Sequence, residues 1–338
     1  MKAAVYKGNK TFSIIERELT EPKPDEVRIK VAYTGVCGTD VHIYHGMMDK
    51  RVSIPETIGH EMSGIIDAVG AEVQNFKIGD RVVVRPLDDR KVKPSDKGFN
   101  HICEELKFIG IDSPGSMQQF WNVPAFTIHK LKPETNLRLA ALIEPLSVAV
   151  HDVRLSGLKE GETAVILGGG PIGLLVALVA KQTGAQVIVS EVNDTRIEKA
   201  KEIGLTAINP LKTDLFSYVK SITENRRADV VFEVAGVQPT LDMMTEVAGI
   251  RGRIVMVAIH GQKKEIDLFQ FFWKELKLIG ARVYEKEDYE KAIELVTENK
   301  VKFEKLITKI RPLSDIQQVF EDIDKQPDGM KILMDCQQ

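Results

Sequence analysis

The sequence predicts an α/β protein in which a doubly wound parallel sheet is joined to a discontinuous, β-rich domain. Three observations carry this prediction. Short apolar runs broken by turns fill the first third of the chain, strands and helices alternate from about Gly161, and further strand-like segments follow about Val283. Strand–helix alternation is typical of parallel sheets, whereas closely spaced short strands favour an antiparallel barrel.

The first third is expected to form a compact, barrel-like β domain. Glycine and proline separate its apolar segments, as they do between short antiparallel strands. The predicted strands are residues 3–6, 13–16, 27–33, 64–69 and 81–84.

The middle of the chain is expected to form the parallel sheet. Its predicted strands are residues 164–167, 187–190, 229–234 and 253–258, and helical stretches such as 172–183 and 196–203 lie between them. The tail holds another amphipathic helix at 289–298, and we expect the tail to fold back onto the first domain. The predicted boundaries are 1–149 for the first domain, 150–285 for the second and 286–338 for the returning segment.

Composition excludes several classes of protein. The net charge of −3 gives no basic footprint for nucleic acid. The longest apolar run, residues 171–180, is too short to cross a membrane, and the N-terminus has no export signal. Three scattered cysteines do not make a disulfide framework, so we expect a cytoplasmic protein.

Residues 164–173, AVILGGGPIG, have the pattern of a strand that turns into a helix through a dinucleotide-binding loop. Gly168 would permit the tight turn, Gly170 the approach of a pyrophosphate, and Gly173 close packing of helix and strand. Pro171 and Ile172 begin the helix, whose N-terminus would face the phosphates. A plain strand–helix turn is the alternative.

Glu191 ends the next predicted strand, about 20 residues on, where the dinucleotide motif requires an acid. Its carboxylate should hydrogen-bond the ribose hydroxyls and repel a 2′-phosphate, which favours NAD over NADP. Arg196 is expected to pack over the adenine or to pair locally. Ala258, at the end of a later strand, is assigned to the same cofactor site. A solvated glutamate at a strand end is the alternative for Glu191.

Cys37, His60, Glu61 and Glu144 stand in the runs GVCGTDVH, GHEMSG and IEPLSVAVH. Thiolate, imidazole and carboxylate are the groups that hold a catalytic zinc and leave one position open. Each residue alone has a structural alternative, as core filler, buried histidine or helix cap. A zinc that polarises an alcohol and a nicotinamide that accepts its hydride belong to one chemistry.

In this order and at these separations, the four motifs resemble the zinc-containing medium-chain dehydrogenases over almost the whole chain. The similarity is greatest to the branch of sorbitol, threonine, butanediol and sugar-acid dehydrogenases. It implies a Rossmann domain for NAD, a GroES-like catalytic domain with one catalytic zinc, and a homo-oligomer, either dimer or tetramer.

The resemblance also implies residue roles. Cys37 and His60 would ligate zinc, while Glu61 and Glu144 would either ligate it or hold its bound water. Thr39 would place its hydroxyl beside the substrate alkoxide. His42 would pass the proton through the cofactor ribose toward solvent, although a surface histidine is the alternative.

Many relatives hold a second, structural zinc with four cysteines. The matching positions here are Asp89, Val92, Ser95 and Cys103. One thiolate cannot replace four ligands, so we expect no structural zinc and a lobe that is looser or held by salt bridges.

The leading hypothesis is NAD-dependent, single-zinc oxidation of a secondary alcohol of a polyol or sugar acid. Threonine 3-dehydrogenase and a butanediol-type dehydrogenase would use the same machinery. A non-catalytic NAD-binding protein is the alternative from another class; it predicts damage at the zinc positions, which are all present.

Overall fold

The computed structural model describes residues 1–298, 303–326 and 329–338. The chain forms two compact units: unit 1 comprises Met1–Glu144 and Tyr289–Gln338, and unit 2 comprises Pro145–Asp288. These junctions lie within five residues of the boundaries expected from the sequence.

Unit 1 is built on a seven-stranded sheet with the order β16-β17-β3-β4-β5-β9, in which β8 also pairs with β3. A separate antiparallel pair, β1 (Lys2–Tyr6) and β2 (Phe12–Glu16), and a short pair, β6 (Leu87–Asp88) and β7 (Lys107–Phe108), accompany it. The strands of the main sheet are β3 (Glu26–Gly35), β4 (Glu61–Val69), β5 (Arg81–Val84), β8 (Phe120–Pro124), β9 (Ile128–Lys130), β16 (Ile307–Pro312) and β17 (Lys331–Asp335).

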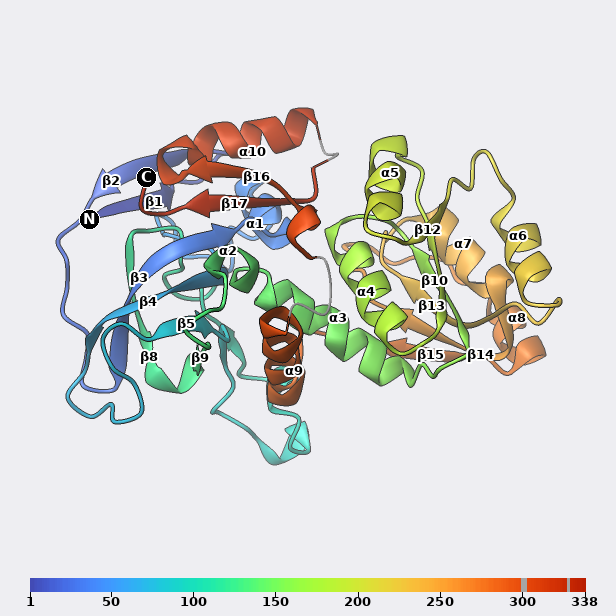
Figure 1. Ribbon diagram of the computed structural model, residues 1–338, viewed down its shortest axis with the longest axis horizontal. Coiled ribbons are helices and arrows are strands. Elements are labelled where there is room, and N and C mark those ends of the chain that lie inside the picture. Colours follow the sequence, from blue (N-terminus) through green and yellow to red (C-terminus); the bar gives the residue numbers. More distant parts are fainter. Residues whose placement is uncertain (299–302, 327–328) are drawn as a thin grey trace. The chain divides into compact units, whose positions relative to one another are not determined.

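The tail of the chain completes this sheet. β17 pairs antiparallel with β3, so the discontinuous β domain is confirmed (Figure 1). The helix α10 (Ile316–Lys325) buries Ile316, Val319 and Phe320, which recur at the spacing of one helix face. Phe320 stacks on Phe12, 4.8 Å between ring centroids.

Four further α-helices among the described residues belong wholly or partly to unit 1. The helix α1 (Gly38–Tyr44) follows β3, and its last residue, Tyr44, lies 5.1 Å from the ring of Phe320, so α10 fixes the end of α1. The others are α2 (Leu137–Ala140), α3 (Ile143–Ser156), which continues into unit 2, and α9 (Lys286–Thr297), which begins in unit 2.

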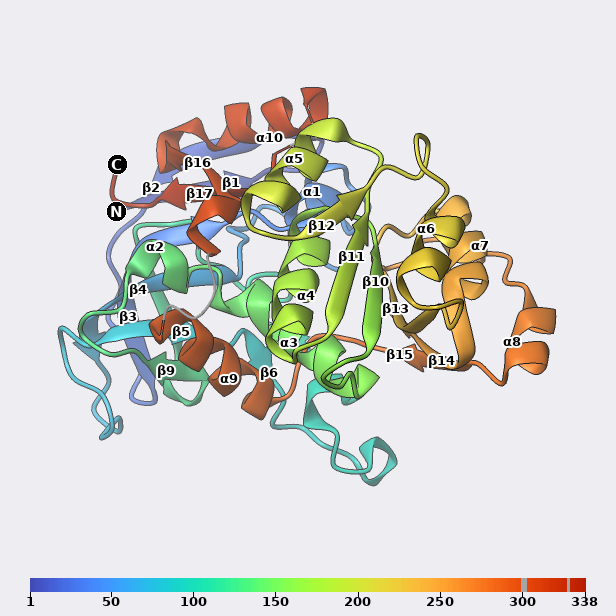
Figure 2. The ribbon, with the colours of Figure 1, turned by 45° about the vertical axis from the view of Figure 1, so that its right-hand side comes forward.

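Unit 2 contains a six-stranded sheet, all parallel, with the order β12-β11-β10-β13-β14-β15. Every residue of β10 is buried, as expected for a strand covered by helices on both faces. Figure 2 shows α4 alongside β10 and β11. The strands are β10 (Thr163–Leu167), β11 (Gln186–Ser190), β12 (Thr206–Ile208), β13 (Ala228–Glu233), β14 (Ala248–Met256) and β15 (Lys277–Gly280).

The helices of unit 2 connect successive parallel strands, which confirms the doubly wound arrangement. They are α4 (Pro171–Gln182), α5 (Asp194–Glu202), α6 (Leu215–Ile222), α7 (Gln238–Val247) and α8 (Leu268–Lys274). Among the described helices, none is both long and apolar enough to cross a bilayer.

Candidate active site

Cys37 lies at the N-terminus of α1, two residues after the end of β3. Asp40, in the first turn of this helix, accepts a hydrogen bond from the backbone N–H of Cys37 at 2.9 Å. A carboxylate in the first turn satisfies a free N–H group and complements the positive end of the helix dipole. This local structure fixes the backbone that carries the thiol.

His60 and Glu61 are brought to Cys37 by the pairing of β3 with β4. Gly35, near the end of β3, is the register partner of Glu61 at the start of β4. A side chain at position 35 would displace the carboxylate of Glu61, so glycine leaves the room that this carboxylate occupies. One donor atom from each of Cys37, His60 and Glu61 lies within 4.8 Å of the others.

The cluster is electrostatically suited to a cation. Burial alone would lower the pKa of His60, but the charges of Asp40 and Cys37 outweigh this effect and raise it to about 10. Burial raises the pKa of Asp40. His60 Nδ1 lies 3.7 Å from Asp40 Oδ1, and both atoms are buried without a hydrogen-bond partner among the described residues. A soft thiolate, an imidazole and a carboxylate together fit zinc.

Lys331 is a member of the cluster that sequence reasoning missed. Its Nζ lies 2.6 Å from Oε1 and 2.5 Å from Oε2 of Glu61, and it donates a hydrogen bond to the carbonyl of Val36 at 3.2 Å. Lys331 is only 3% exposed. Its position follows from the pairing of β17 with β3, which joins residues far apart in the chain. A lysine beginning the buried strand KILMD was the one available signal.

The other predicted residues of unit 1 differ in exposure, and none belongs to the 4.8 Å group. Glu144, in the first turn of α3, is 5% exposed and lies outside the 4.8 Å group, although its charge adds to those that raise the pKa of His60 against burial. Thr39 and His42 both lie on α1; Thr39 is half-buried and His42 is exposed.

The glycine loop of unit 2 joins β10 to α4, as predicted. Gly168 has a φ of +115°, and its backbone passes against Ala235. A side chain at position 173 would collide with the carbonyl of Gly168, so close packing of the turn against the helix requires glycine. Gly170 is the N-cap of α4, and Pro171 with Ile172 forms its first turn.

Glu191 follows β11 directly and turns back onto the glycine loop. Its carboxylate accepts hydrogen bonds from the backbone N–H groups of Gly169 at 2.8 Å, Val192 at 2.8 Å and Asn193 at 2.9 Å. Arg196 Nη1 lies 3.8 Å from Glu191 Oε2, which is the local pairing expected from the sequence. The carboxylate is thus held rigidly beside the turn that would carry the pyrophosphate.

Ala258 lies two residues beyond the end of β14, because this strand starts and ends earlier than the sequence predicted. Its backbone N–H donates to the carbonyl of Glu233 at 3.0 Å, and its methyl group packs against Gly236. Ala258 therefore belongs to the carboxyl edge of the parallel sheet, where ligands of such sheets bind.

The lobe that carries structural zinc in many relatives contains ion pairs here. Asp89, at the first cysteine position, accepts from Arg85 at 2.9 and 3.1 Å. Cys103 is buried. The predicted salt bridges are present, and they include Arg90–Asp88, Lys93–Glu104 and Lys93–Glu105.

A second group of possible ligands lies in unit 2. His151, Glu285 and Asp288 approach one another, but Arg154 forms ion pairs with both carboxylates. His151 Nδ1 lies 2.7 Å from Asp288. Arg154 already pairs with both carboxylates, so the geometry of this group is that of a structural ion-pair network.

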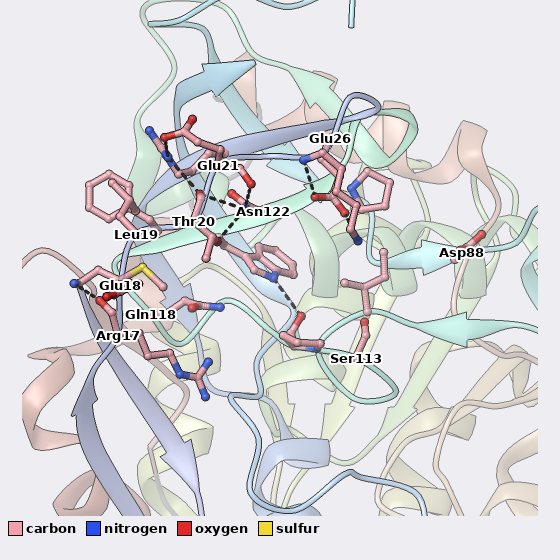
Figure 3. Close-up of a pocket in the computed structure, with 18 of the residues that line it drawn as sticks. Arg17, Glu18, Leu19, Thr20, Glu21, Glu26, Asp88, Ser113, Gln118 and Asn122 are labelled. Atoms are coloured by element: carbon pink, nitrogen blue, oxygen red, sulfur yellow. Dashed lines mark hydrogen bonds and ion pairs between the residues drawn. The ribbon is translucent and has the colours of Figure 1, made fainter. Parts of the chain in front are cut away.

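A cavity of about 650 Å³ opens on unit 1 away from the predicted residues (Figure 3). Glu21, Gln118 and Asn122 point toward it, and Trp121 and Arg28 also line it. Arg28 is already paired with Asp67 at 2.6 Å. The lining includes no residue of the Cys37 cluster.

Comparison with known proteins follows the two halves of this architecture. The family model for an alcohol dehydrogenase GroES-like domain matches residues 23–133, and that for a zinc-binding dehydrogenase matches residues 171–298. The 2-dehydro-3-deoxy-L-galactonate 5-dehydrogenase of Pseudoalteromonas atlantica is 55% identical over 99% of both chains.

Solved structures give the same result. The 2R,3R-butanediol dehydrogenase of Bacillus subtilis matches with a TM-score of 0.90 and 32% identity over 99% of both chains. An alcohol dehydrogenase from E. coli CFT073 complexed with NADH has a TM-score of 0.90 at 30% identity over 99% of both chains. A zinc-binding dehydrogenase from Sinorhizobium meliloti bound to NADP has a TM-score of 0.91 at 30% identity over 98% of both chains.

The chain belongs to the zinc-type medium-chain polyol dehydrogenase family. It is an alcohol or polyol dehydrogenase that uses zinc and a nicotinamide cofactor. The predicted fold class and enzyme class are confirmed.

Proposed function

We propose that this enzyme transfers a hydride from a secondary alcohol of a sugar acid or polyol to NAD. The observation that carries this proposal is the cluster of half-buried Cys37 with buried His60 and Glu61, which offers three different donor types within 4.8 Å. Bound zinc would lower the pKa of the substrate alcohol, and the nicotinamide would accept the hydride.

The residues of unit 1 would have different roles in metal binding and proton transfer. Cys37, His60 and Glu144 would hold zinc, while Lys331 keeps Glu61 paired, so that Glu61 is a reserve ligand or holds the bound water. The hydroxyl of half-buried Thr39 would relay the proton of the substrate alcohol, accepting it while releasing its own proton toward His42. Exposed His42 would deliver that proton to solvent.

The proposed substrate is a sugar acid, since the relative at 55% identity is a 2-dehydro-3-deoxy-L-galactonate 5-dehydrogenase. A panel of 2-dehydro-3-deoxy-L-galactonate, L-galactonate, sorbitol, 2,3-butanediol and threonine with NAD⁺ tests it through absorbance of the reduced cofactor. We expect the highest kcat/KM for a sugar acid. A higher kcat/KM for threonine or butanediol would favour that alternative instead. If the enzyme oxidised no compound of the panel, the proposal would be overturned.

We expect NAD⁺ to be preferred over NADP⁺, because the buried carboxylate of Glu191 would repel a 2′-phosphate. Glu191→Ala should lower the ratio of kcat/KM for NAD⁺ to kcat/KM for NADP⁺, because the variant binds NAD⁺ more weakly and no longer repels NADP⁺. Glu202→Ala is a matched control, since this exposed glutamate ends α5 and pairs with Lys199. Equal kcat/KM for both cofactors in the wild type would contradict the assignment of Glu191.

We further infer a cytoplasmic homo-oligomer, either dimer or tetramer. Phe269, Phe272 and Trp273 of α8 are each more than 60% exposed, and β15 is an edge strand of the parallel sheet. Exposed aromatic surface beside an unpaired edge favours association with another copy. The three cysteines form no disulfide among the described residues, which suits a reducing compartment. Light scattering gives the mass of the assembly.

A further inference from the structure

A fixed turn of unit 1, residues 48–52, follows α1 and carries two adjacent cations, Lys50 and Arg51. The backbone N–H groups of Arg51 and Val52 both donate to the carbonyl of Met48, at 2.8 and 3.0 Å. Asp49 accepts a hydrogen bond from the hydroxyl of buried Tyr6 at 3.3 Å. The turn is therefore anchored to the core, and α1 joins it directly to Cys37.

Arg51 is also linked to His60 of the metal cluster through two other residues. Its Nε lies 2.6 Å from Oδ1 of Asp112, and its Nη2 lies 2.7 Å from Oδ2. Asp112 in turn accepts the backbone N–H of Phe108 at 2.8 Å, and the ring of Phe108 stands edge-on to His60 at 5.1 Å. Arg51 is thus linked to His60 through Asp112 and Phe108, and to Cys37 along the chain through α1.

The free donors of Arg51 are suited to a carboxylate. Asp112 engages Nε and Nη2, whereas Nη1 makes no hydrogen bond with any described residue. The side chain is 42% exposed, so Nη1 can reach a ligand while the fork with Asp112 holds the guanidinium in place. A pre-oriented guanidinium binds carboxylates with little loss of side-chain freedom. Lys50 beside it is exposed and adds a second positive charge.

Two other basic side chains of this part of unit 1 already have carboxylate partners. Lys331 is buried and paired with Glu61. His45, at the end of α1, lies 2.8 Å from Asp324. Of these four basic residues, Arg51 and Lys50 have donors left for an anionic substrate.

We infer that Arg51, assisted by Lys50, binds the carboxylate of a sugar-acid substrate whose reacting hydroxyl lies at the Cys37 cluster. This inference rests on the proposed function. It makes the turn at residues 48–52 the element that distinguishes sugar acids from neutral polyols.

The test compares an acid with a neutral polyol of the same carbon chain. Titration calorimetry on the zinc-loaded enzyme would give dissociation constants for L-galactonate and galactitol, which differ only at C1. Kinetics would follow 2-dehydro-3-deoxy-L-galactonate and sorbitol. Arg51→Met should lower the affinity or kcat/KM for both acids roughly 10- to 100-fold, the loss expected for a charge-assisted hydrogen bond. The same quantities for both polyols should stay within about 2-fold of the wild type.

Two further variants keep the test decisive. Lys50→Met removes only an exposed charge and should lower kcat/KM for the acid by a smaller factor than Arg51→Met. Arg90→Met is the matched control, because Arg90 forms the same bidentate pair, with Asp88, beside Phe126. Arg90→Met should leave the affinity and kcat/KM unchanged for acids and polyols alike.

The outcomes separate this inference from the proposed function. If the wild type oxidises no sugar acid, the proposed substrate is wrong. If it does, and Arg51→Met and Lys50→Met weaken acids and polyols alike or not at all, the carboxylate is bound elsewhere and the inference is overturned.

Discussion

Replacing Cys37 with alanine should remove the bound zinc and lower kcat/KM for alcohol oxidation by roughly 10³-fold or more, since a catalytic metal supplies several kcal/mol of transition-state stabilisation. The thiolate is the one soft donor in the cluster. Without it, His60 and the carboxylates cannot complete the set that a catalytic zinc site requires. Elemental analysis and steady-state kinetics on the same preparation measure both effects.

Cys103→Ala is the matched control for this change. Cys103 is a buried thiol of the same unit, but it lies in the lobe held by ion pairs. We expect it to retain one zinc per chain and full activity. Two zinc ions per chain in the wild type would show that the lobe binds metal after all, and zinc retained by Cys37→Ala would remove the thiolate from the site.

Lys331→Met should destabilise the zinc-free protein by about 3–5 kcal/mol, because it leaves the buried charge of Glu61 without its partner. Zinc should offset much of this loss, since the freed carboxylate can then face the metal. The increase in melting temperature on adding zinc to the stripped protein should therefore be larger in Lys331→Met than in the wild type. Lys331→Arg should behave much like the wild type.

Lys274→Met separates this effect from the loss of any buried lysine. Lys274 is 6% exposed, and its Nζ donates to the carbonyls of Thr245, Glu246 and Ala248, with no carboxylate involved. It should lower the melting temperature without changing the increment from zinc. If zinc raised the melting temperature equally in all the variants, Glu61 would not contact the metal.

The pH dependence of the Lys331 contribution follows from its pKa. Burial opposes protonation of Lys331, but the charges of Glu61 and Cys37 outweigh burial and raise the pKa above 10.5. The stabilising effect is therefore fully present below pH 10.5 and is lost only as the pH rises through the higher folded value. Stability measurements between about pH 7 and 9 should show a constant difference between wild type and Lys331→Met.

The parts of the site that sequence predicted are those encoded by local pattern. The glycine loop and the acid after β11 lie within one strand–helix–strand segment, so spacing alone locates Gly168, Gly173 and Glu191. Cys37 and His60 were found through motifs with recognisable neighbours. Their approach in space depends on the register of β3 with β4, which no single motif contains.

Lys331 and Arg51 show where such reasoning ends. Lys331 is 270 residues from Glu61 in sequence, and only the pairing of β17 with β3 brings the two together. Arg51 reaches Asp112 across 61 residues. Both are contacts between common residue types that lie far apart in the sequence. Composition and periodicity are local properties, so they do not predict such contacts.

The position of β17 has a consequence for how the protein matures. Synthesis proceeds from the N-terminus, and domains generally fold in that order. Unit 2 is a continuous segment that can fold as soon as it has emerged. Glu61, in contrast, pairs with a lysine of the final strand, so its charge is neutralised only when translation is almost complete. A nascent chain stalled before residue 331 would carry the Cys37 and His60 motifs intact and yet lack the partner that holds Glu61, so this carboxylate stays available to a metal ion until the last strand has paired.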